Sequence, residues 1–154
     1  MTCLVNAELL GARMIAVPSA LVAAENHPGQ GPIIVALASK GDTCWCTRLH
    51  RENRIWSIIG EPSLTDSSQL ELDGVESLLG DEHVPAAIAE ICEKMHINVV
   101  QPVLEPAGCL AVAERMLQAG LITDPLSVHP LYPRQPEAAT LWEKAKGTGK
   151  RARK

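Results

Sequence analysis

Residues 33–59 read IIVALASKGDTCWCTRLHRENRIWSII, and this stretch decides the fold that we expect. It holds three apolar runs of about six residues each, rich in β-branched and aromatic side chains. Two short polar breaks separate them, and the first, 39–42, has a glycine suited to a tight turn. We therefore predict a three-stranded antiparallel meander with strands over Ile33–Ala38, Thr43–Leu49 and Arg54–Ile59.

Side-chain alternation orients the middle strand. Cys44 and Cys46 share one face of it, while Trp45 and Leu49 share the other. The run 33–38 is apolar on both faces, which is typical of a strand covered from both sides. We therefore place this run at the centre of a sheet and expect helices on both faces.

The flanking sequence supplies further elements. Helical spacing predicts helices over 20–26, with Ser19 as N-cap, and over 84–96 and 106–120. Short strands are predicted over Arg13–Val17, Val75–Leu79 and Ile97–Val100, whereas 60–73 is polar and weakly patterned. A meander followed by alternating helices and strands predicts an α/β fold, a ribonuclease-H-like lobe with a mixed sheet and flanking helices.

Composition indicates one ordinary globular chain. The 154 residues are 46% hydrophobic and 21% charged, with a formal net charge of −4. No apolar run approaches the length of a membrane span, and the N-terminus lacks the basic start of a secretory signal. Five cysteines without framework spacing suit a reducing compartment, so we expect a cytoplasmic protein.

Positive charge is concentrated at the C-terminus. Residues 144–154 hold six basic and no acidic residues, whereas 1–143 hold eight basic and 18 acidic residues, a formal −10. Such a tail could contact nucleic acid. We interpret 143–154 first as a solvated, disordered tail, and name as possible nucleic-acid contacts Lys150, Arg151, Arg153 and Lys154.

Candidate chemistry is sparse. Cys44 and Cys46 lack the second ligand pair that zinc sites use, so we interpret them as small buried side chains. His83 follows an acidic turn that could bind a cation, but we favour a plain surface turn. The run 33–39 carries no carboxylate where a nuclease or ATPase of this fold would need one. We therefore predict no catalytic, cofactor-binding or metal-binding residues and no enzymatic activity.

Arg134 follows Pro133 in a proline-rich segment. An arginine held in this way can bind a carboxylate or a phosphate. It can also fix the C-terminal segment to the body of the protein through an internal salt bridge, and we favour this second interpretation.

Several stretches together resemble one family. Gly11–Leu21 resembles a small-residue turn, a strand and the start of a helix in that family, and 33–49 resembles its hairpin with Gly41-Asp42 at the turn. Leu79-Gly80-Asp81 resembles its glycine-ended strand. Val128–Arg134 and Trp142-Glu143-Lys144 resemble its C-terminal segment. The family is TsaB (YeaZ), the non-catalytic partner in threonylcarbamoyladenosine modification of tRNA.

The resemblance implies a shortened, two-part chain. Members are longer, two-lobed proteins of the actin-like ATPase fold, so 1–26 would be the remnant of a first lobe and 33–142 the second lobe. It implies a scaffold role beside the catalytic subunit TsaD. We expect a homodimer or a permanent partner that buries 1–25, with an interface that includes Leu4, Val5, Leu9 and Leu10.

Two alternatives stay open. The chain could be a degenerate ribonuclease-H-like protein, or a small enzyme, that binds a nucleotide or a metal ion; those ligands would then raise its thermal stability. It could also be a truncated reading frame, in which case upstream DNA would encode the missing strand in frame.

Overall fold

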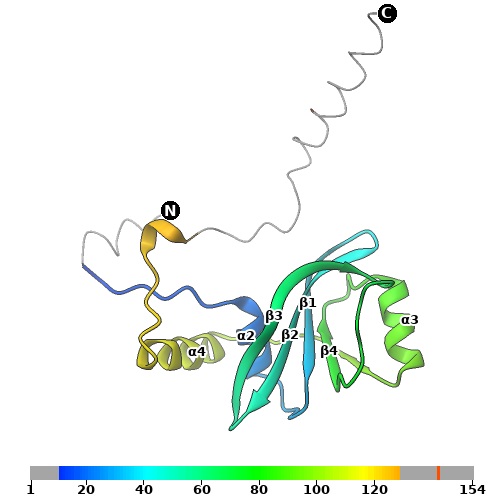
Figure 1. Ribbon diagram of the computed structural model, residues 1–154, viewed down its shortest axis with the longest axis horizontal. Helices are drawn as coiled ribbons and strands as arrows, with labels where there is room; N and C mark the ends of the chain where they lie inside the picture. The colour runs from blue at the N-terminus through cyan, green and yellow to red at the C-terminus, as the bar shows by residue number, and fades with distance from the viewer. Residues whose placement is uncertain (1–10, 129–141, 143–154) are drawn as a thin grey trace, which may run out of the picture.

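The computed structural model describes residues 11–128 and 142, which form a five-stranded mixed sheet with helices on both faces (Figure 1). The strand order is β3-β2-β1-β4-β5, and only β2 runs against the others. The elements, in chain order, are α2 (Ser19–Glu25), β1 (Ile33–Lys40), β2 (Thr43–Glu52), β3 (Ile55–Asp66), β4 (Ser77–Gly80), α3 (Ala86–Lys94), β5 (Asn98–Val100), α4 (Pro106–Gln118) and the 3-10 turn η1 (Pro125–Ser127).

The meander is confirmed, with β1 at the centre of the sheet. β1 pairs antiparallel with β2 and parallel with β4, and β2 pairs antiparallel with β3. The third strand is longer than predicted, because it continues to Asp66 through residues that lack hydrophobic alternation. Gly60 at φ 68° accommodates a register shift there, and Pro62 is tolerated because β3 is an edge strand.

Two apolar clusters lie on opposite faces of the sheet. Ile34 and Ala36 of β1 face α3, in a cluster with Cys44, Cys46, Leu78, Ile88 and Cys92. Ile33 and Val35 face α2, in a cluster with Ala20, Ala23, Ala24, Leu49, Trp56 and Leu79. Residues 33–36 are at most 3% exposed, which confirms that this strand is covered on both sides. Helix α2 packs in one apolar cluster with residues of the sheet. The division of the chain into 1–26 and 33–142 stays a prediction.

Two predictions about the start of the chain were wrong. Helix α2 begins after Pro18, whose carbonyl oxygen accepts the first helical hydrogen bond, so Ser19 is a helical residue and gives no side-chain cap. The predicted strand over 13–17 is reduced to one bridge between Met14 and Thr123, because no strand of the sheet lies beside it. Within the described residues, no helix is both long and apolar enough to cross a membrane.

The loop between α2 and β1 encloses polar side chains at the start of β1. Glu76 Oε2 accepts a hydrogen bond of 2.5 Å from the amide nitrogen of Gly31, and Nη1 of Arg51 donates to the carbonyl oxygen of Gly29 at 3.0 Å. A Cβ atom on Gly29 would lie 2.5 Å from Nε2 of His27, so the loop closes this tightly only with glycine there. His27 is buried, and this burial lowers its pKa below 6.5. The negative charge of Glu76 acts to raise this pKa and the positive charge of Arg51 acts to lower it, but burial has the largest effect.

This pKa predicts acid sensitivity. The folded protein holds His27 neutral, so below its unfolded pKa of 6.5 the unfolded chain binds a proton that the folded chain resists. The contribution of His27 to stability is therefore complete above this pH and is lost as the pH falls towards the lower folded pKa. We expect the free energy of unfolding to fall less steeply between about pH 7.5 and pH 5 in His27→Gln than in the wild type. Urea titrations at each pH measure this, and equal slopes would contradict it.

Candidate protein-interaction surface

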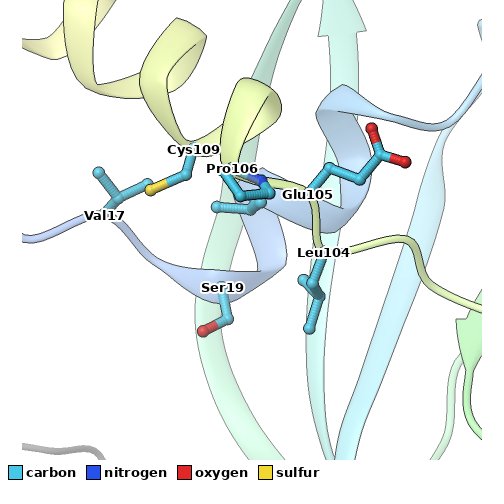
Figure 2. A pocket seen from close by; sticks show the side chains of 7 residues that line it. Val17, Ser19, Leu104, Glu105, Pro106 and Cys109 are labelled. Carbon is cyan, nitrogen blue, oxygen red and sulfur yellow. The ribbon is translucent and has the colours of Figure 1, made fainter.

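An open hollow of about 290 Å³ lies where the first turns of α2 and α4 meet. Figure 2 shows the sulfur atom of Cys109 pointing towards Val17, with Leu104 and Ser19 on another side of the hollow. The lining is mostly apolar, and Glu105 is its one charged residue. The hollow is lined by Val17, Ser19, Val22, Leu104, Glu105, Pro106 and Cys109. Leu104 is 55% exposed, so the hollow opens beside an apolar rim.

Asn26 fixes the relative position of the two helices. Its Nδ2 donates to the carbonyl oxygens of Val22 at 3.2 Å and of Val103 at 3.0 Å, which joins the end of α2 to the segment before α4. Gly108 packs directly on this amide, and a Cβ there would lie 2.7 Å from Nδ2 of Asn26. The hydrogen bond from Asn26 to Val103 and the missing side chain of Gly108 together allow the end of α2 to lie close to the start of α4.

A bidentate ion pair holds the last turn of α4 against the C-terminal end of α2. Nη1 of Arg115 donates to Oε1 of Glu25 at 3.0 Å and Nη2 donates to Oε2 at 2.5 Å, while the two side chains are 32% and 20% exposed. Together with Gly108 and Val112, Arg115 forms the face of α4 that points at α2, with spacings of four and three residues. Parallel hydrogen bonds of this kind fix geometry as well as adding energy.

Removing one partner of this ion pair leaves a shielded charge uncompensated. We expect Arg115→Met, which keeps the aliphatic stem, to lower the free energy of unfolding by about 1–2 kcal/mol. The double variant Glu25→Gln/Arg115→Met is the control, because it removes both charges and should recover part of that loss. Urea unfolding of both single variants and the double variant measures the coupling, and strictly additive losses would contradict the prediction.

Exposed apolar side chains lie on α4 and on the segments before and after it. Leu110 of α4 is 65% exposed. Thr123 is fixed beside the N-terminal segment, since its amide nitrogen donates to Met14 O at 2.8 Å and its Oγ1 accepts from Ala16 N at 3.0 Å. Six large apolar side chains on α4 and on its flanking segments are at least 45% exposed. They are Val103, Leu104, Leu110, Leu121, Ile122 and Leu126. Exposed apolar side chains of this size make α4 and its flanks the candidate contact region for a partner.

The structure also locates the other candidate residues. Cys44 and Cys46 are buried, with their Sγ atoms 3.4 Å apart, and the hydrogen bond from Cys44 lowers the pKa of Cys46. Cys92 of α3 packs in the same cluster, and burial raises its pKa. Within residues 11–128 and 142, no group of three His, Cys, Asp or Glu residues is arranged to hold a metal ion. The interpretation of Cys44 and Cys46 as small core side chains is consistent with this packing.

The acidic turn before α3 uses its carboxylate internally. Oδ1 of Asp81 accepts a hydrogen bond from the amide nitrogen of His83 at 2.9 Å, and the His83 ring lies 3.9 Å from an equally exposed Glu82 carboxylate. This geometry is that of a surface turn. The predicted interface residues Leu4, Val5, Leu9 and Leu10 lie outside the described residues, as do Arg134 and the predicted nucleic-acid contacts Lys150, Arg151, Arg153 and Lys154.

Comparison with known proteins gives matches in structure and none in sequence. No family model matches the chain, and no curated protein sequence is similar to it. The structure is similar to YeaZ from Pseudomonas aeruginosa, with a TM-score of 0.62 at 12% identity over 85% of this chain and 64% of that one. The chain has a YeaZ-like fold. A crystal structure of an uncharacterized protein with similarity to peptidase YeaZ from Pseudomonas aeruginosa matches with a TM-score of 0.66 at 11% identity, over 86% of this chain and 64% of that one.

The YeaZ-like fold is thus shared over most of this chain, which spans less than two thirds of the length of either matched structure. The contacts that build the α2–α4 surface were not predictable from sequence. Glu25 and Arg115 are 90 positions apart, and Asn26 meets Val103 across 77 positions. The one local signal was Gly108 within an otherwise regular helix, since an isolated helical glycine often marks close packing.

Proposed function

We propose that the chain is a non-catalytic, TsaB-like scaffold subunit that supports threonylcarbamoyladenosine modification of tRNA. The similarity of its structure to YeaZ carries this proposal. The sheet order supports a ribonuclease-H-like lobe, because a three-stranded meander is followed by two parallel strands that extend the sheet beyond β1. β1 also carries no carboxylate, which favours a supporting role over a catalytic one.

The proposed partner is a TsaD-like catalytic subunit, and the exposed apolar surface of α4 and its flanks is where we place the contact. Leu110 and Leu126 are 65% and 77% exposed there, so a partner could bury them without rearranging the core. A homodimer is a second way to cover apolar surface, and the basic tail is where tRNA contact would occur. For a protein in this role we infer a cytoplasmic location.

Two measurements test the proposal. A tagged full-length chain is used to capture the TsaD-like subunit of its own organism, and threonylcarbamoyladenosine is quantified in tRNA from a strain in which the gene is deleted. We expect a stable complex and a loss of the modified nucleoside that the intact gene restores. Failure to capture the subunit together with an unchanged level of modification would overturn the proposal.

A further inference from the structure

We propose that two copies of this chain pair through their β3 strands, antiparallel about a twofold axis at Ser57, so that the two five-stranded sheets join into one. The contact is between copies of the chain and does not depend on the TsaD-like partner, whose proposed site lies on α4 and its flanks. It assigns an occupant to an edge of the sheet that no described strand covers.

The first step of the argument is the free edge of β3. This strand is the outermost one on its side of the sheet (Figure 1). A free edge carries unpaired backbone donors and acceptors, which proteins commonly block with a proline, a charge or a bulge. The far part of β3 is blocked by the register shift at Gly60 and by Pro62. Residues 55–59 contain neither a proline nor a charge, so this part of the edge is open to another strand.

The turn before β3 determines which backbone groups face the free edge. Residues 53–54 form a two-residue turn with φ of 51° and 66°, and the flanking Glu52 and Ile55 are register partners. Such a turn closes with a hydrogen bond between its flanking residues, and bonded and non-bonded pairs alternate along an antiparallel ladder. Every second residue from Ile55 therefore bonds to β2. The backbone groups of Trp56 and Ile58 point the other way, towards the free edge.

These backbone groups select one register for a twofold pair. An axis at Ser57 aligns 55–59 of one copy with the same five residues of the other, in the opposite direction. Trp56 of each copy then lies opposite Ile58 of the other, which allows about four backbone hydrogen bonds between the copies. An axis at Trp56 or at Ile58 would leave part of the open segment without a partner. The register centred on Ser57 therefore uses the free edge most completely.

The same register brings the exposed apolar side chains of β3 together. Ile55 and Ile59 are 48% and 42% exposed, and Ser57 between them is also exposed. They share one face of the sheet with Ile34, since Ile59 pairs with Arg48 and Arg48 pairs with Ile34. About the proposed axis, Ile55 of each copy lies opposite Ile59 of the other. Apolar cross-strand pairs of this kind stabilise antiparallel sheets, so one contact covers both isoleucines.

Charge at the two ends of the open segment is complementary. Arg54 precedes the segment and Glu61 follows it, and both are exposed. The ion pairs described for residues 11–128 include neither of them. The register brings Arg54 of each copy within one position of Glu61 of the other, at both ends of the contact. A parallel arrangement would place like charges beside each other, so these two residues favour the antiparallel one.

Ser57→Cys tests the axis directly. Non-bonded antiparallel partners have Cα atoms about 4.5 Å apart, which a disulfide can bridge. The variant is made in the full-length chain with Cys3→Ser and Cys109→Ser, because the remaining cysteines are buried. Glutathione disulfide is the oxidant, and it takes up the two thiol hydrogens as it is reduced to two glutathione thiols. We expect a covalent dimer joined through position 57, identified by mass spectrometry of its peptides.

Ser63→Cys in the same background is the matched control. Ser63 is exposed on the same strand, and its partner Cys46 lies on the same face as Ile34 and Ala36. It lies well away from the proposed axis, so the two copies of this position are far apart in the dimer. We expect no covalent dimer from it. Equal cross-linking at positions 57 and 63, or none at position 57, would overturn the proposal.

Sedimentation velocity tests the contact without a cross-link. One strand from each copy makes a small interface, so we expect the dimer to be populated at a chain concentration of about 100 μM. Ile59→Asp should raise the dimer dissociation constant at least about tenfold, because the carboxylate would be desolvated beside Ile55 of the other copy. Arg54→Glu should raise it severalfold, and Glu61→Arg added to Arg54→Glu should restore the wild-type value.

The same experiment shows what would contradict the contact. A monomer at the highest of these concentrations overturns the proposal, and so does a dimer that is as strong in Ile59→Asp as in the wild type, because its interface then lies elsewhere. Binding of the TsaD-like subunit should be the same in Ile59→Asp and the wild type. A failure of that partner proposal therefore leaves this one unaffected.

Discussion

Replacing Trp56 with alanine is expected to lower the free energy of unfolding by about 3–5 kcal/mol, a large part of the roughly 5–15 kcal/mol that stabilises a domain. Trp56 is 4% exposed and lies in the apolar cluster between α2 and the sheet. Arg51 stacks over its ring, with the guanidinium carbon 5.3 Å from the ring centroid, and the His27 ring lies 6.4 Å away. Alanine would therefore open a cavity at the junction of α2, β2 and β3.

Trp56→Phe is the matched control, because phenylalanine keeps an aromatic ring beneath Arg51. Nε1 of Trp56 has no hydrogen-bond partner among the described residues, so phenylalanine breaks no described hydrogen bond. We expect it to cost about 1–2 kcal/mol, because phenylalanine is smaller than tryptophan and leaves a residual cavity much smaller than that left by alanine. Urea unfolding followed by far-ultraviolet circular dichroism measures both variants. A loss below about 1 kcal/mol in Trp56→Ala would show that this cluster does not stabilise the fold as the packing indicates.

The central sheet was predictable because its signals are local. The apolar run 33–36 and the glycine turn at Gly41 define β1 and its hairpin within a few residues, and both are where the sequence placed them. The far half of β3 was missed because pairing with β2, rather than its own polar sequence, makes 60–66 a strand. Tertiary context overrides local β-propensity in this way, particularly at the edge of a sheet.

The candidate surface was predictable only in part, because long-range polar contacts orient α4. Helical spacing predicted the helix over 106–120, but it did not show which face of that helix would contact α2. Asn26 packs against Gly108 and Glu25 pairs with Arg115, so the face of α4 that carries these two residues contacts α2. Leu110 therefore points away from α2 and is 65% exposed. A polar pairing 90 positions apart leaves no trace in local periodicity, so this orientation required the three-dimensional structure.

Leu110→Asp is expected to weaken binding of the TsaD-like subunit by at least about tenfold, or about 1.4 kcal/mol. A carboxylate at this exposed apolar position would have to be desolvated when the partner covers α4, and hot-spot residues at the centre of interfaces contribute on this scale. The fold should be unaffected, because Leu110 lies outside both apolar core clusters. Binding is measured by titration calorimetry, with thermal unfolding of the free chain recorded alongside.

Ile59→Asp is the control for this substitution, since it makes the same chemical change at a 42% exposed position on β3, outside the α2–α4 surface. If the interface lies on α4, Leu110→Asp and Leu126→Asp both lose affinity while Ile59→Asp binds as the wild type does. If all three bind equally well, a TsaD-like partner does not use this surface. If Ile59→Asp alone fails, the contact lies on the β2–β3 side of the sheet, and the apolar side chains of α4 and its flanks then need a different partner to explain their exposure.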